Sequence, residues 1–348
     1  MNSTIAMFLA QDGIINGAIY ALVGVTLVLV FAVTRVIFVP QGEFIAWAAL
    51  TVAALEAGSV PGTAWLLLVL GVIAALLEIA REGRQLPPSR IGGMLLKDIA
   101  LPAALLASVI WFAPLKLGIA FNIVVTFALL VPMGPLVYRI AFQPLADASV
   151  LVLLIASIGV HFALVGLGLV FFGAEGVRTQ PLLGGSFPAG PLVLKWQSLA
   201  VLAATVLVML GLYAFFERTM MGKALRATAV NRLGARLVGI PVRSTGRIAF
   251  ALAAAIGAIS GILIGSLTTI YYDSGFLIGL KGFVAAIIAG LGSYPLTALS
   301  ALFVGLLESY SAFFASAFKE VIVFSIIIPV LLWRSLASGP HHDDEEEV

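Results

Sequence analysis

Five ionisable residues lie within or at the ends of long apolar stretches of this chain, and their side chains are the ones best placed to do chemistry there. These residues are Glu43, His161, Asp273, Lys281 and Glu308. A charged group inside a membrane is costly, so it faces the interior of a helical bundle, where it pairs or marks a pathway. Of the five, Glu43 and Glu308 are our candidate pathway residues.

Glu308 lies within the otherwise apolar stretch 295–315. Small residues share its helical face, which predicts that a neighbouring helix packs over it and that the carboxylate points into the bundle. These small residues are Ala301, Gly305, Ala312 and Ala315. The carboxylate has two candidate partners, the backbone freed around Gly290–Gly292 and the ammonium group of Lys281. A structural brace and a direct role along a pathway are both open interpretations.

The sequence contains no recognisable catalytic or cofactor-binding motif. HExxH and GxSxG patterns are missing, and cysteine is absent, which removes disulfides, cysteine metal sites and thiol chemistry. His161 has no acidic residue at helical spacing, so we interpret it as a hydrogen-bonded interior residue. The only Gly-Lys pair, Gly222-Lys223, is followed by Ala224 instead of Ser or Thr, which excludes a phosphate-binding loop. We expect no cofactor, no metal and no enzymatic activity.

Composition identifies the medium that surrounds these residues. Of the 348 residues, 61% are hydrophobic and only 10% are charged, and the mean hydropathy is +1.14. A soluble domain carries about a quarter charged residues, so this chain cannot cover a water-facing surface. Long apolar runs favour helices over a barrel. The first 13 residues contain no Lys or Arg, so we expect a retained first span in place of a cleaved signal.

Apolar segments of helical length must position the ionisable groups. The candidate segments are 14–34, 43–57, 61–80, 99–114, 118–138, 148–172, 197–216, 247–270, 277–291, 295–315 and 319–335. A full crossing needs about 20 residues, so we interpret 43–57, 99–114 and 277–291 as candidate half-helices or re-entrant pieces. The predicted fold class is all-α, a polytopic transmembrane helical bundle of about 8–11 membrane segments.

The distribution of basic residues predicts the orientation. With an external N-terminus and eleven crossings, 14 Lys and Arg residues fall on one side and 5 on the other, which together make the 19 of the chain. Positive charge concentrates on the cytoplasmic side of membrane proteins. We therefore expect a multi-pass protein of the bacterial inner membrane, with a periplasmic N-terminus and a cytoplasmic C-terminus.

The most basic stretch is GKALRATAVNRLGARLVGI, residues 222–240. Its apolar positions recur every fourth residue, which predicts a short surface helix. Two interpretations are open, a basic anchor against anionic lipid heads and a docking helix for a soluble partner. A nucleic-acid patch is excluded because the stretch lacks interleaved aromatic residues. The candidate docking residues are Gly222, Lys223, Arg226, Ala227, Arg232 and Gly239.

Glycines mark two further features. Gly257, Gly261 and Gly265 recur at four-residue spacing, which predicts close helix packing. In KGFVAAIIAGLGSYP, residues 281–295, Gly290 and Gly292 interrupt an apolar run. Broken spans occur at the substrate sites of transporters, although a plain turn between helices fits the same pattern.

Four stretches resemble the membrane permease subunit of branched-chain amino acid ABC importers. Residues 12–44 resemble the first helix and Gly-Glu turn of that family, and residues 221–240 resemble its cytoplasmic coupling segment. Residues 282–309 resemble its glycine-rich break and the acidic helix that follows, and residues 142–160 also fit its pattern. The resemblance implies a permease that other subunits supply with ATP hydrolysis and substrate.

The resemblance also implies a division of the chain. Residues 1–338 would form the permease domain, with an insertion at 81–117 and a cytoplasmic coupling loop at 217–246, followed by an acidic tail at 339–348. The implied partners are two ATP-binding subunits, a second homologous permease subunit and a periplasmic substrate-binding protein. The loop 173–196 is long enough to meet the last of these. The implied substrate is a small amino acid, and no nucleic acid is expected.

Two alternatives accompany this interpretation. In the first alternative, the chain is a permease of the same family whose substrate is urea, a short amide or an aromatic acid. Outside it, the chain is a stand-alone secondary transporter or channel, a class that carries ionisable residues inside its spans.

Overall fold

The computed structural model describes residues 3–82, 88–190 and 192–338, and most of these residues lie in helices. The α-helices are α1 (Ser3–Thr34), α2 (Gln41–Ala57), α3 (Gly62–Glu82), α4 (Pro88–Leu95), α5 (Leu101–Phe112), α6 (Ile119–Val137), α7 (Val150–Phe172), α8 (Trp196–Arg218), α9 (Met220–Val230), α10 (Arg232–Leu237), α11 (Val242–Ile264), α12 (Ser274–Ile288), α13 (Tyr294–Phe314), α14 (Lys319–Ser325) and α15 (Ile327–Ser338). Short π- and 3₁₀-helices extend several of them, namely η2 (Leu96–Ala100), η3 (Ala113–Leu115), η4 (Tyr138–Phe142), η5 (Gln143–Leu145) and η6 (Ser316–Phe318). One antiparallel hairpin joins β1 (Ser186–Ala189) to β2 (Leu192–Lys195).

The described residues include nine helical stretches that are long and apolar enough to cross a membrane. The shorter helices α2 and α12 correspond to two further predicted segments, so each of the eleven candidate segments contains helix. The predicted fold class, a polytopic transmembrane helical bundle, is confirmed.

One predicted boundary is wrong. The segment 99–114 is part of a continuous 25-residue stretch, Ile91–Leu115, and is long enough to cross a membrane. The residues of η2 carry the helix through Lys97 and Asp98, two charges that made the stretch look short in the sequence. The segment 319–335 is likewise not one straight helix, because α14 and α15 are separated at Ile326.

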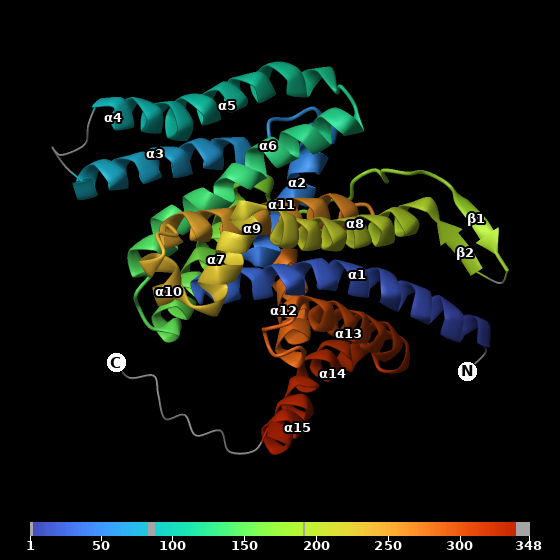
Figure 1. Cartoon of the computed structure of the whole chain (residues 1–348). Coiled ribbons are helices and arrows are strands. Elements are labelled where there is room, and N and C mark those ends of the chain that lie inside the picture. The colour runs from blue at the N-terminus through green and yellow to red at the C-terminus, as the bar shows by residue number, and fades with distance from the viewer. Residues whose placement is uncertain (1–2, 83–87, 191, 339–348) are drawn as a thin grey trace.

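Helix α1 runs through the middle of the bundle and packs along α13 (Figure 1). Glycines allow this contact. A Cβ atom on Gly17 would lie 2.7 Å from the Cα atom of Leu302, and one on Gly305 would lie 2.3 Å from the carbonyl oxygen of Gly13. Close approach of backbones through small residues is the usual basis of helix association in lipid. Of the small residues predicted to share the face of Glu308, Ala301 and Gly305 pack against α1, whereas Ala312 is exposed and Ala315 lies beyond the end of α13.

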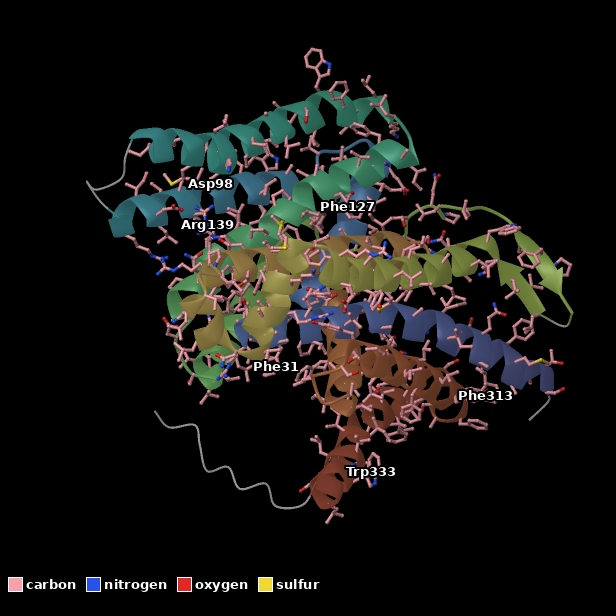
Figure 2. All side chains as sticks on the ribbon, in the orientation of Figure 1. Phe31, Asp98, Phe127, Arg139, Phe313 and Trp333 are labelled. Atoms are coloured by element: carbon pink, nitrogen blue, oxygen red, sulfur yellow. The ribbon has the colours of Figure 1, made fainter. Side chains whose placement is uncertain are left out.

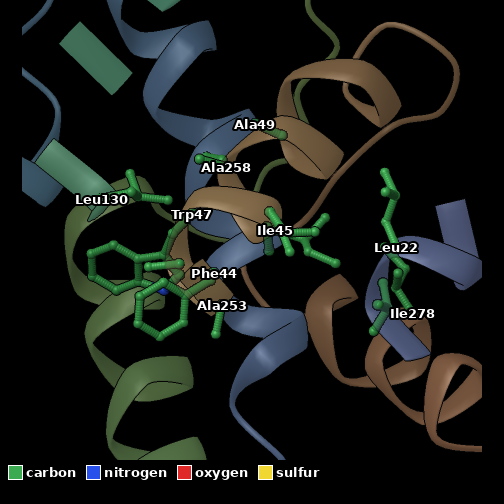
Figure 3. Packing of buried hydrophobic residues seen from close by; sticks show 14 of the residues in the cluster. Leu22, Phe44, Ile45, Trp47, Ala49, Leu130, Ala253, Ala258 and Ile278 are labelled. Carbon is green, nitrogen blue, oxygen red and sulfur yellow. The ribbon is translucent and has the colours of Figure 1, made fainter. Parts of the chain in front are cut away.

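Helix α2 forms the centre of the core, and α6, α11 and α12 surround it. Its residues from Gln41 to Val52 are all buried. Helix α11 lies against it through Gly261, whose Cβ would meet the carbonyl oxygen of Ile45 at 2.2 Å. Figure 3 shows Phe44, Ile45 and Trp47 of α2 within this packing. The three-glycine pattern of α11 thus serves helix packing.

Two ends of the bundle are distinct in Figure 1. The hairpin and the start of α1 lie at one end, and α9 and α10 lie at the other. Helices α3 and α4–α5 form an outer layer on one side, with α6 between them and the centre. This layer is tied to η4 by Arg139, which forms ion pairs with Glu78 of α3 and with Asp98 of η2.

Candidate transport pathway

A buried network of charged side chains surrounds Glu308. The Nζ atom of Lys281 lies 2.5 Å from Oε1 of Glu308 and 3.2 Å from Oε1 of Glu320. The hydroxyl group of Tyr20 donates a hydrogen bond of 2.5 Å to Oε2 of Glu308. Tyr20, Lys281 and Glu308 are all buried. Two partners were predicted for Glu308. Among the described residues, its carboxylate pairs with Lys281 and forms no hydrogen bond with the backbone around Gly290–Gly292.

This network joins four elements. Tyr20 comes from α1, Lys281 from α12, Glu308 from α13 and Glu320 from the first turn of α14. The cost of placing these charges in the bundle is offset only when each is paired and hydrogen-bonded. The network therefore fixes the positions of the four helices relative to one another.

The same side chains line a polar cavity of about 520 Å³ near the start of α1. Three cations and three carboxylates line it. The cations are Lys195, Lys281 and Lys319, and the carboxylates are Asp12, Glu308 and Glu320. This cavity, called the polar cavity below, carries a balanced set of charges.

A second cavity, the apolar cavity, has a volume of about 800 Å³ and lies between α7 and α12. Its wall consists mostly of aliphatic and aromatic side chains, which include Leu154, Ile158, Phe162, Val165, Phe276, Leu277 and Leu280. Three polar side chains also line it, those of His161, Asp273 and Ser274. An apolar cavity with a few convergent polar groups is typical of a site for a small molecule.

Glu43 lies behind the wall of the apolar cavity and is fully buried. Its Oε1 atom is 3.0 Å from Nδ1 of His161, which is an ion-pair distance. Apart from His161, neither carboxylate oxygen of Glu43 has a polar partner among the described residues. Glu43 lies in the first turn of α2, where the positive end of the helix dipole stabilises its charge.

The pairing of Glu43 with His161 is a contact that the sequence did not predict. Helical periodicity relates residues of one helix, and these two lie on α2 and α7. The available signal was that each is the isolated ionisable residue of an apolar segment. Tyr20 and Glu320 were also missed, since a tyrosine hydroxyl group and a carboxylate near a helix end do not stand out in sequence.

The polar and apolar cavities share two lining residues, Ser274 and Leu277 in the first turn of α12. A third space of about 610 Å³, the end cavity, lies where α1 and α9 both end. Its lining includes Val28 and Val150, which neighbour Leu27 and Leu154 of their helices. Leu27 and Leu154 line the apolar cavity, so α1 and α7 border both the apolar cavity and the end cavity.

The candidate break at Gly290 and Gly292 lies at the end cavity, which Gly292 lines. Helix α12 ends at Ile288, and Gly290 and Leu291 both have positive φ, 77° and 57°. The Leu291 N–H donates to the carbonyl oxygen of Ala286 at 2.9 Å, and the Gly290 N–H donates to Ile287 at 2.8 Å. These bonds close the helix end as a Schellman motif does. The break has the form of a turn between α12 and α13.

The basic stretch folds as two helices and not as the single one that its four-residue periodicity predicts. Asn231 ends α9 and begins α10, and its Oδ1 atom accepts a hydrogen bond of 2.7 Å from the Gly234 N–H. Leu225 therefore faces the bundle and is buried, whereas Leu233 and Leu237 are exposed. The exposed apolar residues of this region, called the exposed apolar set below, are Met220, Met221, Val230, Leu233, Leu237 and Val238.

Arginines tie α10 to the segment that precedes α7. Arg232 donates to the carbonyl oxygen of Ala146 at 2.9 Å, and Arg236 donates to Oδ1 of Asp147, also at 2.9 Å. The hydrogen bond from Arg236 lowers the pKa of the exposed Asp147 carboxyl group. These bonds connect α10 to the residues just before α7, and α7 forms one wall of the apolar cavity.

The other candidate docking residues have different surroundings. Arg226 pairs with Glu217 at 2.7 Å, Lys223 is exposed and Ala227 is half-buried. Gly222 is buried where α9 turns back on α8, and its Cβ would lie 2.1 Å from the Phe215 carbonyl oxygen. Gly239 has a φ of 83° and open space around it, so its backbone conformation requires glycine and its neighbours do not.

These features define a class of protein, a polytopic membrane protein with polar and apolar cavities among its helices. The sequence matches the family described as branched-chain amino acid transport system / permease component over residues 92–331, more than half of the chain. The chain belongs to this family.

Individual relatives agree. The chain is 32% identical over 230 residues to the high-affinity branched-chain amino acid transport system permease protein BraD of Pseudomonas aeruginosa. The aligned region covers 64% of this chain and 74% of BraD. It is 31% identical over 201 residues to the protein LivH of Escherichia coli, of the same description, which covers 56% of this chain and 65% of LivH. A probable branched-chain amino acid transport permease protein of Methanocaldococcus jannaschii is 27% identical over 219 residues. The resemblance stated from the sequence is confirmed.

Proposed function

We propose that this chain is the permease subunit of an ABC importer and that it conducts branched-chain or similarly hydrophobic amino acids. The observation that carries the proposal is the apolar cavity of about 800 Å³, with its aliphatic wall and three polar side chains. Transfer of a branched aliphatic side chain from water to such a wall is favourable, by roughly 1.5–3 kcal/mol for a Val, Leu or Ile side chain. Urea has no such group, so the lining favours an aliphatic amino acid.

In the proposed route, the substrate enters at the polar cavity and leaves through the end cavity. Asp12 and Lys195 line this cavity outside the Glu308 network, and they would interact with the ammonium and the carboxylate group of an amino acid. Ser274 and Leu277 line both that cavity and the apolar cavity, so we infer that the first turn of α12 is the gate between them. Within the apolar cavity, His161, Asp273 and Ser274 meet the polar end of the substrate.

The partner subunits we propose are those of an ABC importer. Two ATP-binding subunits would supply the energy, one of them docking on α9 and α10. The exposed apolar set supports this docking, because Leu237 is 80% exposed and lies outside the predicted spans. On a soluble protein, an exposed apolar patch of this kind marks an interaction site. The bonds from Arg232 and Arg236 then carry the movement of α10 to α7.

Two further partners belong to the proposal. A second homologous permease subunit would pair with this one in the bacterial inner membrane. A periplasmic substrate-binding protein would meet the end of the bundle that carries the hairpin β1–β2, where Leu183 and Val193 are exposed. The N-terminus would then be periplasmic and the C-terminus cytoplasmic.

The test is uptake by the purified complex. The tagged chain is expressed with its neighbouring genes, and co-purifying subunits are identified by mass spectrometry. The complex is reconstituted into vesicles, and uptake of radiolabelled leucine, phenylalanine and urea is measured with and without ATP. We expect ATP-binding subunits in the complex and ATP-dependent uptake of leucine. Leucine uptake that needs an ion gradient and no ATP would indicate a secondary transporter, and ATP-dependent uptake of urea alone would overturn the substrate assignment.

A further inference from the structure

A fourth cavity lies away from the proposed route and has a different chemistry. Its volume is about 1010 Å³, and α3, η2, η4, η5 and the start of α11 enclose it. Five cations line it, which are Arg81, Lys97, Arg139, Arg243 and Arg247. The carboxylates that line it are Glu78, Asp98 and Asp147. We call this space the basic cavity, because its lining has an excess of positive charge.

The carboxylates of the basic cavity are already engaged. Glu78 and Asp98 both pair with Arg139, and Asp147 pairs with Arg236 of α10. The guanidinium group of Arg247 contacts only a neutral acceptor, Oε1 of Gln143, at 3.2 Å and 3.1 Å. Within the described ranges, Lys97 and Arg243 have no carboxylate partner.

The start of α11 adds to this excess. Pro241 caps the helix without a side-chain hydrogen bond, and the first turn contains no acidic residue. The N-terminus of a helix carries a partial positive charge, so Arg243 in this first turn is electrostatically unfavourable unless an anion is near. Pro241, Arg243 and Ser244 of this turn all line the cavity. An anion bound there would satisfy the Val242 and Arg243 N–H groups, which have no backbone acceptor in the described part of the chain, together with the cations of the lining.

We propose that the basic cavity binds a phosphate group, presented by an anionic membrane lipid or by a soluble phosphate compound. Arginine and lysine clusters recognise phosphate through charge-assisted hydrogen bonds. Leu95, Leu96 and Leu101 are exposed on the adjoining α4–η2–α5 stretch, so the surface beside the cavity can also contact acyl chains. Figure 2 shows Asp98 and Arg139 at the inner wall of this region. The site is independent of the amino acid route.

The experiment compares charge variants in defined lipids. The complex is placed in nanodiscs of phosphatidylglycerol and phosphatidylcholine, and the lipids that stay bound are counted by native mass spectrometry. The double variant Lys97→Gln, Arg243→Gln removes two of the cations that have no carboxylate partner among the described residues. The matched control Arg218→Gln removes an exposed cation from the same end of the bundle, at the last turn of α8. Neither change touches the pairs of Arg139.

We expect the wild type to retain phosphatidylglycerol in preference to phosphatidylcholine, and each removed cation to weaken this preference about fivefold, the factor that corresponds to about 1 kcal/mol per charge. The control should stay unchanged. A second arm adds inorganic pyrophosphate to the complex in a neutral detergent and follows its thermal unfolding. A shift in the wild type alone, without lipid preference, would assign the site to a soluble phosphate compound.

The proposal is overturned if neither probe distinguishes the double variant from the Arg218→Gln control. Thermal unfolding without added ligand reports whether the double variant is folded. If it is not, the single variant Arg243→Gln carries the same comparison, because it leaves every ion pair of the described residues in place.

Discussion

Lys281 is the residue on which the polar cavity depends. Its ammonium group contacts carboxylates of two different helices, Glu308 and Glu320, and lies 5.8 Å from the centre of the Tyr20 ring. Removing one member of a buried charge pair leaves the other uncompensated, at a typical cost of 3–5 kcal/mol, roughly a third of the stability of a small domain. The network is thus able to serve as a brace and as a binding surface with the same atoms.

Substitution of Glu308 separates these two roles. In Glu308→Gln, the amide oxygen still accepts the hydrogen bond from Tyr20, and Glu320 still neutralises Lys281. We therefore expect near-normal folding and uptake. In Glu308→Leu, both partners lose their acceptor, and we expect uptake to fail and the free energy of unfolding to fall by about 3–5 kcal/mol.

The measurement is leucine uptake in cells at matched expression, with Glu175→Gln in an exposed loop as the control. A Gln variant that folds and does not transport would assign a direct role in the pathway to the charge of Glu308. Normal uptake by the Leu variant would remove both roles.

At the scale of helices, α9 and α10 are the elements that link a soluble partner to the bundle. Ala227→Trp should block the close approach of an ATP-binding subunit, so ATP hydrolysis continues while uptake is lost. The same outcome is expected for a bulky residue at Gly239, but there the φ of 83° adds backbone strain. Gly239→Asn is therefore the control, since Asn tolerates this conformation. Normal uptake by Ala227→Trp would favour a lipid anchor over a docking helix.

A substitution in α11 tests whether its glycines are needed for close packing against α2. Gly261→Ala places a methyl group 2.2 Å from the carbonyl oxygen of Ile45, so the helices must separate. Overpacking of this kind costs about 1–3 kcal/mol. Gly166→Ala on α7 is the matched control, because nothing lies within 4 Å of its Cβ. We expect a lower Tm in detergent only for Gly261→Ala. Equal Tm values for the two variants would show that α11 and α2 can move apart without a loss of stability.

Some of these elements were predictable from sequence and others were not. The apolar segments and the glycine spacing of α11 depend on residues close in the chain, so composition and periodicity identify them. The pairing of Glu43 with His161, and of Glu320 with Lys281, depends on which helices become neighbours, which one sequence does not encode locally. Asn231 is an intermediate case, because Asn is a common helix-capping residue but the four-residue apolar periodicity continues across it.

At the scale of the whole molecule, the proposed route, the docking helices and the basic cavity adjoin one another, because α9 lines the end cavity and Asp147 of the basic cavity pairs with Arg236 of α10. The acidic tail 339–348 lies outside the described residues, and its five consecutive acids and lack of apolar periodicity predict that it is dispensable. Truncation after Gly339 should leave uptake and co-purification of the ATP-binding subunits unchanged. A large loss of those subunits would identify the tail as a contact.

The central claim is that the substrate passes the apolar cavity, and a pair of tryptophan substitutions on α7 tests it most directly. Ile158 lines the cavity, whereas Val170 is 77% exposed on the same helix. We predict that Ile158→Trp reduces leucine uptake at least tenfold, about 1.4 kcal/mol, and that Val170→Trp leaves it near the wild-type rate at equal expression. Equal uptake by the two variants would contradict a route through this cavity.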